Sequence, residues 1–194
     1  MQKNNTHIFE NIKELQERIA EYEDEVAYKK LFFLLFIPLK NFSYAIVKCK
    51  ETAEEIVSDV FVEIWARRKK LLEIENLKMY IYISVKNASI RKLQLIKKIK
   101  KISLNDLTVT LAAADPNAED AMISKDMLQK IEFAINQLPA QCKIIFKLAK
   151  DDQLKYKEIA QLLSISVKTI DNHLATALKK IASVLNLPTK KSTK

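Results

Sequence analysis

The stretch YKEIAQLLSISVKTIDNHLATALKKI, residues 156–181, decides the fold of the C-terminal part of the chain. Its apolar residues recur at the spacing of two amphipathic helices, and a short polar turn separates the two runs. Ser166 is expected to cap the second helix, because its hydroxyl can accept a hydrogen bond from a backbone amide one turn later. Ile165 is expected to fill the angle between the helices, which gives a helix-turn-helix. The apolar positions are Tyr156, Ile159, Ala160, Leu163, Val167, Ile170, Leu174, Leu178 and Ile181.

The second of these helices has a polar outer face, and a helix that lies in a major groove presents such a face to base edges. Lysines flank the unit where phosphates would run. An ordinary solvated face is the alternative, and His173 alone would also fit a solvated surface histidine. The other histidine, His7, is far away in the sequence, so a metal site is not favoured. The polar residues are Lys168, Thr169, Asp171, Asn172, His173 and Thr176, and the flanking lysines are Lys155, Lys157, Lys179 and Lys180.

The composition narrows the classes of protein that fit. The 194 residues carry a formal net charge of +9 and are 48% hydrophobic, so the chain can bury cores and still attract polyanions. Glycine is absent, which argues against phosphate-cradling loops and a dinucleotide-binding fingerprint. Nucleotide-dependent catalysis of those kinds is therefore not expected. We expect that the protein is not an enzyme and binds no cofactor. Ser164 stands where a helix-helix turn often has glycine, at a stability cost of roughly 1 kcal/mol at most.

The two cysteines and the N-terminal sequence favour a cytosolic protein. Cys49 and Cys142 are far apart and lie within apolar helical patterns, which favours buried, reduced thiols. The N-terminus lacks the basic-then-apolar pattern of a signal peptide. The longest apolar run, Leu31 to Leu39, is too short to span a bilayer and contains Pro38, so we expect no insertion into a membrane.

Helical spacing continues through nearly the whole chain, which predicts an all-α protein of two small helical domains. We expect an N-terminal extension at 1–19, a first domain at 20–96, a linker at 97–123, a second domain at 124–187 and a basic tail at 188–194. Leu107 to Leu111 is a short, strand-like piece within the linker. The linker begins basic and ends acidic, so it could follow a charged channel or serve as a solvated tether.

One helix of the first domain has two faces of opposite character. Its apolar stripe is expected in the core, and its other face is acidic on a basic chain. An acidic face is usually only solvated, but it could also dock on a basic protein partner. The stripe comprises Ala53, Ile56, Val57, Val60, Phe61, Ile64 and Trp65, and the acidic face comprises Glu54, Glu55, Ser58, Asp59 and Glu63.

The sign of the charge reverses directly after this helix. Aromatic residues among cations suit unstacked bases, because stacking is worth about 1 to 3 kcal/mol per base. Tyr80 and Tyr82 could equally be core or rim aromatics, and Asn87 could pair with a base edge. The cations are Arg67, Arg68, Lys69, Lys70, Lys78, Lys86, Arg91 and Lys92.

Taken together, these residues resemble a bacterial sigma-70 family sigma factor of the extracytoplasmic-function (ECF) group, with a region 2 domain joined by a linker to a region 4 domain. The resemblance covers roughly Glu23 to Leu187. It rests on AEEIVSDVFVEIW (53–65), LKMYIYISVKNASIRK (77–92), INQLPAQCKIIFKLAKDDQL (135–154) and the helix-turn-helix. The SVKNASI wording and the lysine-rich, glycine-poor style look like members from Bacteroidetes-type bacteria.

For region 2, the resemblance implies that Glu55, Ser58 and Asp59 bind the clamp helices of the largest subunit of core RNA polymerase. It also implies capture of the non-template strand of the −10 element, with Asn87 near a flipped base. Two departures are Tyr80, where the family often has tryptophan, and Ile83, where many members have arginine. The residues implied in −10 binding are Lys78, Tyr80, Tyr82, Lys86, Asn87 and Arg91.

For region 4, the resemblance implies readout of the −35 element as duplex DNA and a contact of residues 142–150 with the flap of the second-largest polymerase subunit. A membrane-anchored anti-sigma protein is a further implied partner. The protein would be cytoplasmic, associated with the nucleoid through the polymerase. The residues implied in −35 binding are Lys155, Lys157, Ser166, Lys168, Thr169, Asn172, His173 and Lys179, and Asp171 receives no role.

The resemblance therefore predicts a sigma factor that binds core polymerase, recognises both promoter elements and helps to melt the DNA. One alternative is a stand-alone regulator that binds duplex DNA through the helix-turn-helix alone. Another is a helical adaptor that binds protein through the acidic face, with its basic regions serving solubility. Changes at Asn87, Asn172 and His173 would leave the activity of such an adaptor intact.

Overall fold

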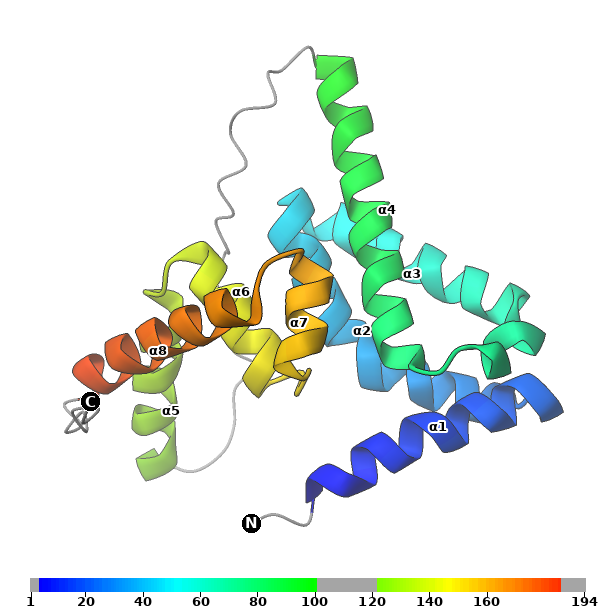
Figure 1. Cartoon of the computed structure of the whole chain (residues 1–194), viewed down its shortest axis with the longest axis horizontal. Coiled ribbons are helices and arrows are strands. Elements are labelled where there is room, and N and C mark those ends of the chain that lie inside the picture. The colour runs from blue at the N-terminus through cyan, green and yellow to red at the C-terminus, as the bar shows by residue number, and fades with distance from the viewer. Residues whose placement is uncertain (1–3, 101–121, 186–194) are drawn as a thin grey trace. The chain divides into compact units, whose positions relative to one another are not determined.

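The structure, a computed structural model, describes residues 4–100 and 122–185, and within these ranges every regular element is a helix (Figure 1). The prediction of an all-α fold is thereby confirmed. The chain divides into two compact units, unit 1 at Met1–Asp106 and unit 2 at Leu107–Lys194. Each unit has its own core.

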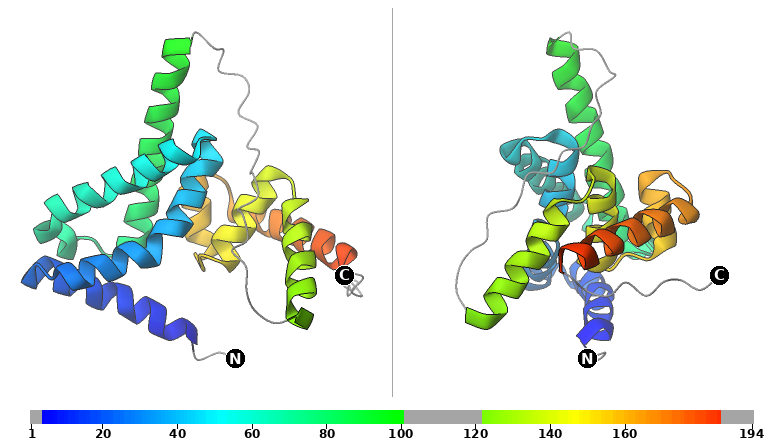
Figure 2. Two further views of the ribbon diagram at one scale, coloured as in Figure 1. Left: turned by 180° about the vertical axis from the view of Figure 1, so that it is seen from behind. Right: turned by 90° about the vertical axis from the view of Figure 1, so that its left-hand side faces the viewer.

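Unit 1 contains α1 (Asn4–Tyr22), α2 (Glu25–Val47), α3 (Lys50–Ala66), the 3-10 helix η1 (Arg68–Glu73) and α4 (Leu77–Lys100). Helices α2, α3 and α4 pack against one another, and α1 packs on α2 and η1. The C-terminal part of α4 extends beyond the other helices of the unit (Figure 2). The centre of the core is formed by Leu31, Leu39, Val57, Phe61, Ile81 and Val85, all at most 1% exposed.

The apolar stripe predicted for α3 is confirmed, with one difference at its end. Six of its seven residues are buried, from Ala53 to Ile64. Trp65 is half-buried instead, and its ring lies 4.9 Å from that of Tyr28 on α2. The guanidinium carbon of Arg68 lies 4.9 Å from the centroid of the same indole, which is a cation–π contact at the edge of the core.

Helix α2 is longer than its apolar run suggested. The helix continues through Pro38, so Leu31–Leu39 forms the middle of a 23-residue element. By length and composition α2 could cross a membrane, and it is the one such helix among residues 4–100 and 122–185. Those two properties also belong to core helices. Here Leu31, Leu35 and Leu39 are buried where α2 packs on α3 and α4.

The N-terminal extension expected at 1–19 is, over its described part, a helix of unit 1. Ile12, Leu15 and Ile19 are at most 6% exposed, at a spacing that places them on one side of α1. The chain then turns at Glu23, whose φ is 51°, and Asp24 caps α2 by accepting from the amides of Val26 and Ala27 at 2.8 and 3.0 Å. The first domain therefore begins before residue 20.

Unit 2 contains α5 (Met122–Asn136), α6 (Ala140–Lys150), α7 (Tyr156–Leu163) and α8 (Val167–Val184). Helix α8 packs on the other three. Of the linker expected at 97–123, residues 97–100 belong to α4 and 122–123 to α5. The remainder, with the strand-like piece Leu107–Leu111, lies outside the described residues, as does the tail at 188–194.

The predicted helix-turn-helix is formed by α7 and α8. Helix α7 ends at Ser164, whose φ of 57° and ψ of 43° are left-handed, so a non-glycine residue carries the conformation that glycine usually supplies. The Ser166 hydroxyl accepts from the amide of Thr169 at 3.0 Å, as expected of an N-cap. The half-buried Ile165 donates its amide to Ala160 across the turn.

The buried face of this motif differs by one position in each helix from the predicted face. Leu162 is fully buried while Leu163 is half-buried, and Ala177 is fully buried while Leu178 is 51% exposed. Tyr156 and Val167, at the first position of each helix, are also exposed, at 41% and 39%.

Candidate nucleic-acid and protein interfaces

The acidic face of α3 is exposed, as predicted, but part of its charge is already paired within unit 1. The Lys92 ammonium on α4 donates to both carboxylate oxygens of Glu55, each at 3.0 Å. Glu54 pairs with Lys40 of α2 at 3.1 Å. Exposed pairs of this kind contribute at most about 1 kcal/mol, so a stronger partner can replace them. Ser58 and Asp59 are exposed beside them on the same face.

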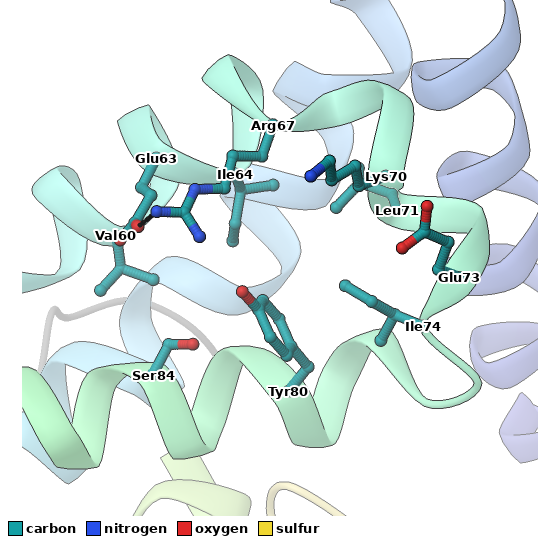
Figure 3. A pocket seen from close by; sticks show the side chains of 10 residues that line it. All are labelled: Val60, Glu63, Ile64, Arg67, Lys70, Leu71, Glu73, Ile74, Tyr80 and Ser84. Carbon is teal, nitrogen blue, oxygen red and sulfur yellow. Dashed lines mark ion pairs between the residues drawn. The ribbon is translucent and has the colours of Figure 1, made fainter.

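A hollow of about 260 Å³ lies between α3, η1 and α4 (Figure 3). Tyr80 projects from α4 towards α3 across this hollow and is 37% exposed. Arg67 lies on the opposite wall, where its guanidinium pairs with Glu63 at 2.7 Å. The hollow therefore combines an aromatic face, a cation and apolar walls. Its lining is completed by Val60, Ile64, Lys70, Leu71, Glu73, Ile74 and Ser84.

Beyond the hollow, the exposed surface of α4 continues as one stripe. Asn87 and Arg91 are exposed, and they follow Tyr80 and Ser84 at spacings of three and four residues, so all four share a helix face. Lys86 is half-buried beside them. Tyr80, Asn87 and Arg91, which the sequence predicted in −10 binding, lie on this stripe. Ser84 was not predicted, although its position between Tyr80 and Asn87 indicates the same helix face.

Two residues predicted in −10 binding lie elsewhere. Tyr82 is fully buried, and its ring lies 5.5 Å from that of Phe42 on α2, so it cannot stack on a base in this structure. It shares the inner face of α4 with Val85 and Ser89. Lys78 is only 9% exposed, close to the start of α4. Two positions along an α-helix correspond to a rotation of more than half a circle, so Tyr80 and Tyr82 lie on opposite faces of α4 although they are close in the sequence.

On unit 2, the outer face of α8 carries Lys168, Asn172 and Lys179, all exposed. Lys155 and Lys157 are exposed at the start of α7. These five residues fit the predicted surface. Ser166 and Thr169 are partly occupied at the helix start, because their hydroxyls lie 2.8 Å apart and the Ser166 hydroxyl caps the helix. In this structure both side chains help to form the start of α8.

His173, which could also have been a solvated surface histidine, is half-buried. Its Nδ1 lies 3.1 Å from the Sγ of Cys142 on α6. Burial raises the pKa of the Cys142 thiol, so the sulfur keeps its proton at neutral pH. The ring is thereby held against α6, with one nitrogen already engaged by the protein.

The cysteines and helix α6 differ in part from prediction. Cys142 is buried as expected, but Cys49 is half-buried and stands at the N-cap of α3, with its Sγ 3.0 Å from Glu51. On α6, Ile145, Phe146 and Leu148 are buried in unit 2, whereas Ile144 and Ala149 are half-buried. Lys143 is also buried, its ammonium donates to Asn136, and burial lowers its pKa.

Within the described residues, no group of three or more histidine, cysteine, aspartate or glutamate side chains could hold a metal ion.

Comparisons with known proteins place both units in one family. Residues 37–98 match the model for sigma-70 region 2, and residues 128–181 match the model for sigma-70 region 4. A search of curated proteins gives no match to this sequence.

Two solved structures have a similar fold. One is the sigma factor RpoE in complex with the anti-sigma factor NepR from Bartonella quintana, with a TM-score of 0.56 at 17% identity, covering 84% of this chain and 98% of that one. The other is CnrH in complex with the cytosolic domain of CnrY, with a TM-score of 0.51 at 14% identity, covering 91% of this chain and 97% of that one.

The two family matches together take in more than half of the chain, and they fall on α2 to α4 of unit 1 and on α5 to α8 of unit 2. The solved structures share the fold over most of the chain. The chain is therefore a member of the sigma-70 family, with a region 2 domain in unit 1 and a region 4 domain in unit 2.

Proposed function

We propose that the protein is an ECF-type sigma factor that binds core RNA polymerase, recognises the −35 and −10 elements and helps to melt promoter DNA. The observation that carries this proposal is the presence in one chain of two different surfaces. Unit 1 has a hollow that continues into the stripe of Tyr80, Ser84, Asn87 and Arg91 on α4. Unit 2 has a helix-turn-helix with a polar, lysine-flanked outer face.

In unit 1, the hollow is suited to a base that has left the duplex. The Tyr80 ring offers a stacking surface, and the Arg67 guanidinium and Ser84 hydroxyl offer hydrogen-bond donors on other walls. Stacking is worth about 1 to 3 kcal/mol per base, and extruding a base costs a few kcal/mol. The captured strand then follows α4, where Asn87 contacts a base edge and Arg91 and Lys86 contact phosphates. Tyr82 supports this surface from the core.

In unit 2, α8 lies in the major groove of the −35 element. Asn172 and Lys168 are placed for base edges, because an exposed amide can pair with adenine and an ammonium with guanine. Lys155, Lys157 and Lys179 contact the phosphates on either side, which fixes the register of the helix. The His173 ring, held by Cys142, borders this surface.

Docking on core polymerase uses the acidic face of α3. Asp59 and Ser58 are exposed at its centre, and Glu55 becomes available when a basic surface competes with Lys92 for its carboxylate. The clamp helices of the largest subunit are the proposed partner. The flap of the second-largest subunit contacts the part of α6 that is not buried, which comprises Lys150 and the half-buried Ile144 and Lys147.

An anti-sigma protein is a further proposed partner. The RpoE and CnrH structures are both complexes, with the anti-sigma factor NepR and with the cytosolic domain of CnrY. A regulator of this kind, anchored in the membrane, would hold the sigma factor in the cytoplasm away from polymerase. The proposed activity needs no bound cofactor and no reaction catalysed by the protein itself.

The test is permanganate footprinting of promoter DNA with the purified protein, with and without bacterial core polymerase. The expected result is thymine reactivity only when both components are present, which also maps the melted element. Protection of a duplex site by the protein alone, with no reactive thymines, would favour the stand-alone regulator. An activity of the protein that Asn87→Ala, Asn172→Ala and His173→Ala all leave unchanged would favour the adaptor.

A further inference from the structure

A buried polar side chain on α1 holds the segment that forms one wall of the hollow. Gln16 is 6% exposed. Its amide nitrogen donates to the carbonyl of Leu71 and, at 2.8 Å, to the carbonyl of Ile74. Leu71 and Ile74 both line the hollow. One side chain from the N-terminal helix thus joins two backbone positions of the wall.

The backbone hydrogen bonds within this wall are short-range. Helix η1 is a single short 3-10 element that ends at Glu73, and the last carbonyls of a helix lack partners within it. The local bonds from Lys70 to Arg67 and from Ile74 to Leu71 close one turn each. The Gln16 amide links this segment to α1.

A second link joins the same segment to the turn between α1 and α2. The Arg68 guanidinium donates to the Glu23 carboxylate at 2.7 Å, and Lys69 lies 3.6 Å from it. Their neighbours Arg67 and Lys70 line the hollow. Glu23 therefore ties η1 to the turn between α1 and α2 through the two cations that do not line the hollow.

We propose that α1 and the turn after it act as a brace that fixes the shape of the hollow, with Gln16 and Glu23 as positioning residues for strand capture. The inference rests on the proposed function of the hollow as a base site. It extends that function to a helix outside the region 2 match, which begins at residue 37. Neither residue touches the captured base. Both act through η1.

The first test concerns the free protein and needs no DNA. Trp65 is the single tryptophan of the chain, and Arg68 covers its ring at 4.9 Å. Gln16→Met removes both donors at similar length, and Glu23→Gln removes the charge that holds Arg68. Both variants are expected to raise quenching of Trp65 fluorescence by acrylamide about twofold, because covering by a cation is weakened. Glu17→Gln, on the exposed face of α1, is the matched control and should quench like the wild type.

The second test uses holoenzyme reconstituted with core polymerase and a single-stranded oligonucleotide of the −10 non-template sequence. An abasic site is moved along the oligonucleotide. For wild type, one position is expected to weaken binding about tenfold, as the loss of one stacked base predicts. Gln16→Met and Glu23→Gln should lower the affinity for the intact oligonucleotide towards that of the abasic one. The affinity for the abasic oligonucleotide should stay unchanged. Affinity for core polymerase should stay at the wild-type value.

The outcomes separate the two levels of the proposal. Wild type with no sensitive position would overturn the hollow as a base site, whatever the variants do. Wild type with a sensitive position, together with variants that retain the full discrimination, would overturn the brace. Equal losses on both oligonucleotides would also overturn it, because a general loss of folding lowers both alike. Since Glu23 is exposed, its variant keeps the test decisive if Gln16→Met does not fold.

Discussion

The two surfaces that we propose for nucleic acid are built in different ways. On unit 2, the surface is one face of α8, and its residues are four and seven positions apart in the sequence. On unit 1, the hollow combines α3, η1 and α4 and depends on Gln16 from α1, 55 residues before Leu71. A duplex has a regular groove that one helix can fit, whereas an extruded base needs walls on several sides. The difference therefore follows from what each surface would bind.

The charged residues of the two units differ in a similar way, because those of α8 lie on one helix and those of unit 1 connect several. On α8, Lys168 and Lys179 are exposed, eleven positions apart. In unit 1, cations form ion pairs that join separate helices, as Lys92 does with Glu55 and Lys40 with Glu54. Part of the charge of unit 1 therefore also serves to hold its helices together.

Truncation of a core residue should have the largest effect and tests whether the units are separate. Phe61 is 1% exposed, and its ring lies 4.9 Å from that of Phe32. Phe61→Ala should destabilise unit 1 by about 3 to 5 kcal/mol, because it leaves a cavity in a packed core. The measurement is urea unfolding followed by Trp65 fluorescence. Leu162→Ala, in the core of unit 2, is the matched variant and should leave that transition in place; a shift would show that the cores are coupled.

Reversal of one charge on the acidic face should have the next largest effect. Asp59→Arg places a cation where a basic polymerase surface is proposed to bind, and like charges in an interface cost several kcal/mol. We expect affinity for core polymerase to fall by tenfold or more, with normal unfolding. The measurement is competition for core in solution. Glu75→Arg makes the same charge change at an exposed site outside the face, and an equal loss there would argue against α3 as the docking surface.

Removal of one amide from α8 should have a smaller effect that depends on sequence. Asn172→Ala is expected to lose about 1 to 3 kcal/mol of promoter binding at one position of the −35 element, and to relax the preference there. Lys179→Ala should instead weaken binding to all sequences and reduce the dependence on salt. Thr176→Ala, whose hydroxyl donates to the Asn172 carbonyl, is the control. Holoenzyme binding to single-base variants of the element measures all three.

The same contrast explains which parts of the molecule could be predicted from sequence. The helices, the α3 stripe and the helix-turn-helix follow from local periodicity, and so does the exposed face of α8. The hollow could not be predicted, because no local pattern brings Arg67, Tyr80 and Gln16 together. Tyr82 was misjudged for a related reason: burial against Phe42 depends on how α2 packs on α4, which the spacing of aromatic residues does not report.

The smallest predicted effect concerns the two helix caps, one charged and one neutral. In unit 1, Asp24 caps α2, and the amide of Ala27 together with the Arg18 guanidinium holds the pKa of Asp24 below its ordinary value of 3.8. In unit 2, the Ser166 hydroxyl caps α8. Asp24→Asn keeps an oxygen acceptor but removes the charge, whereas Ser166→Ala removes the acceptor and should cost about 1 kcal/mol.

The pH dependence of these two variants should differ. Because the pKa of Asp24 is lowered by folding, its charge stabilises the protein fully above pH 3.8, and this contribution is lost as the pH falls through the lowered pKa. The difference in Tm between wild type and Asp24→Asn should therefore be present at neutral pH and close in acid. The difference for Ser166→Ala should be constant, because a hydroxyl does not titrate in this range. A gap for Asp24→Asn that stays constant through the same acid titration would show that the ionised cap contributes no stability of its own.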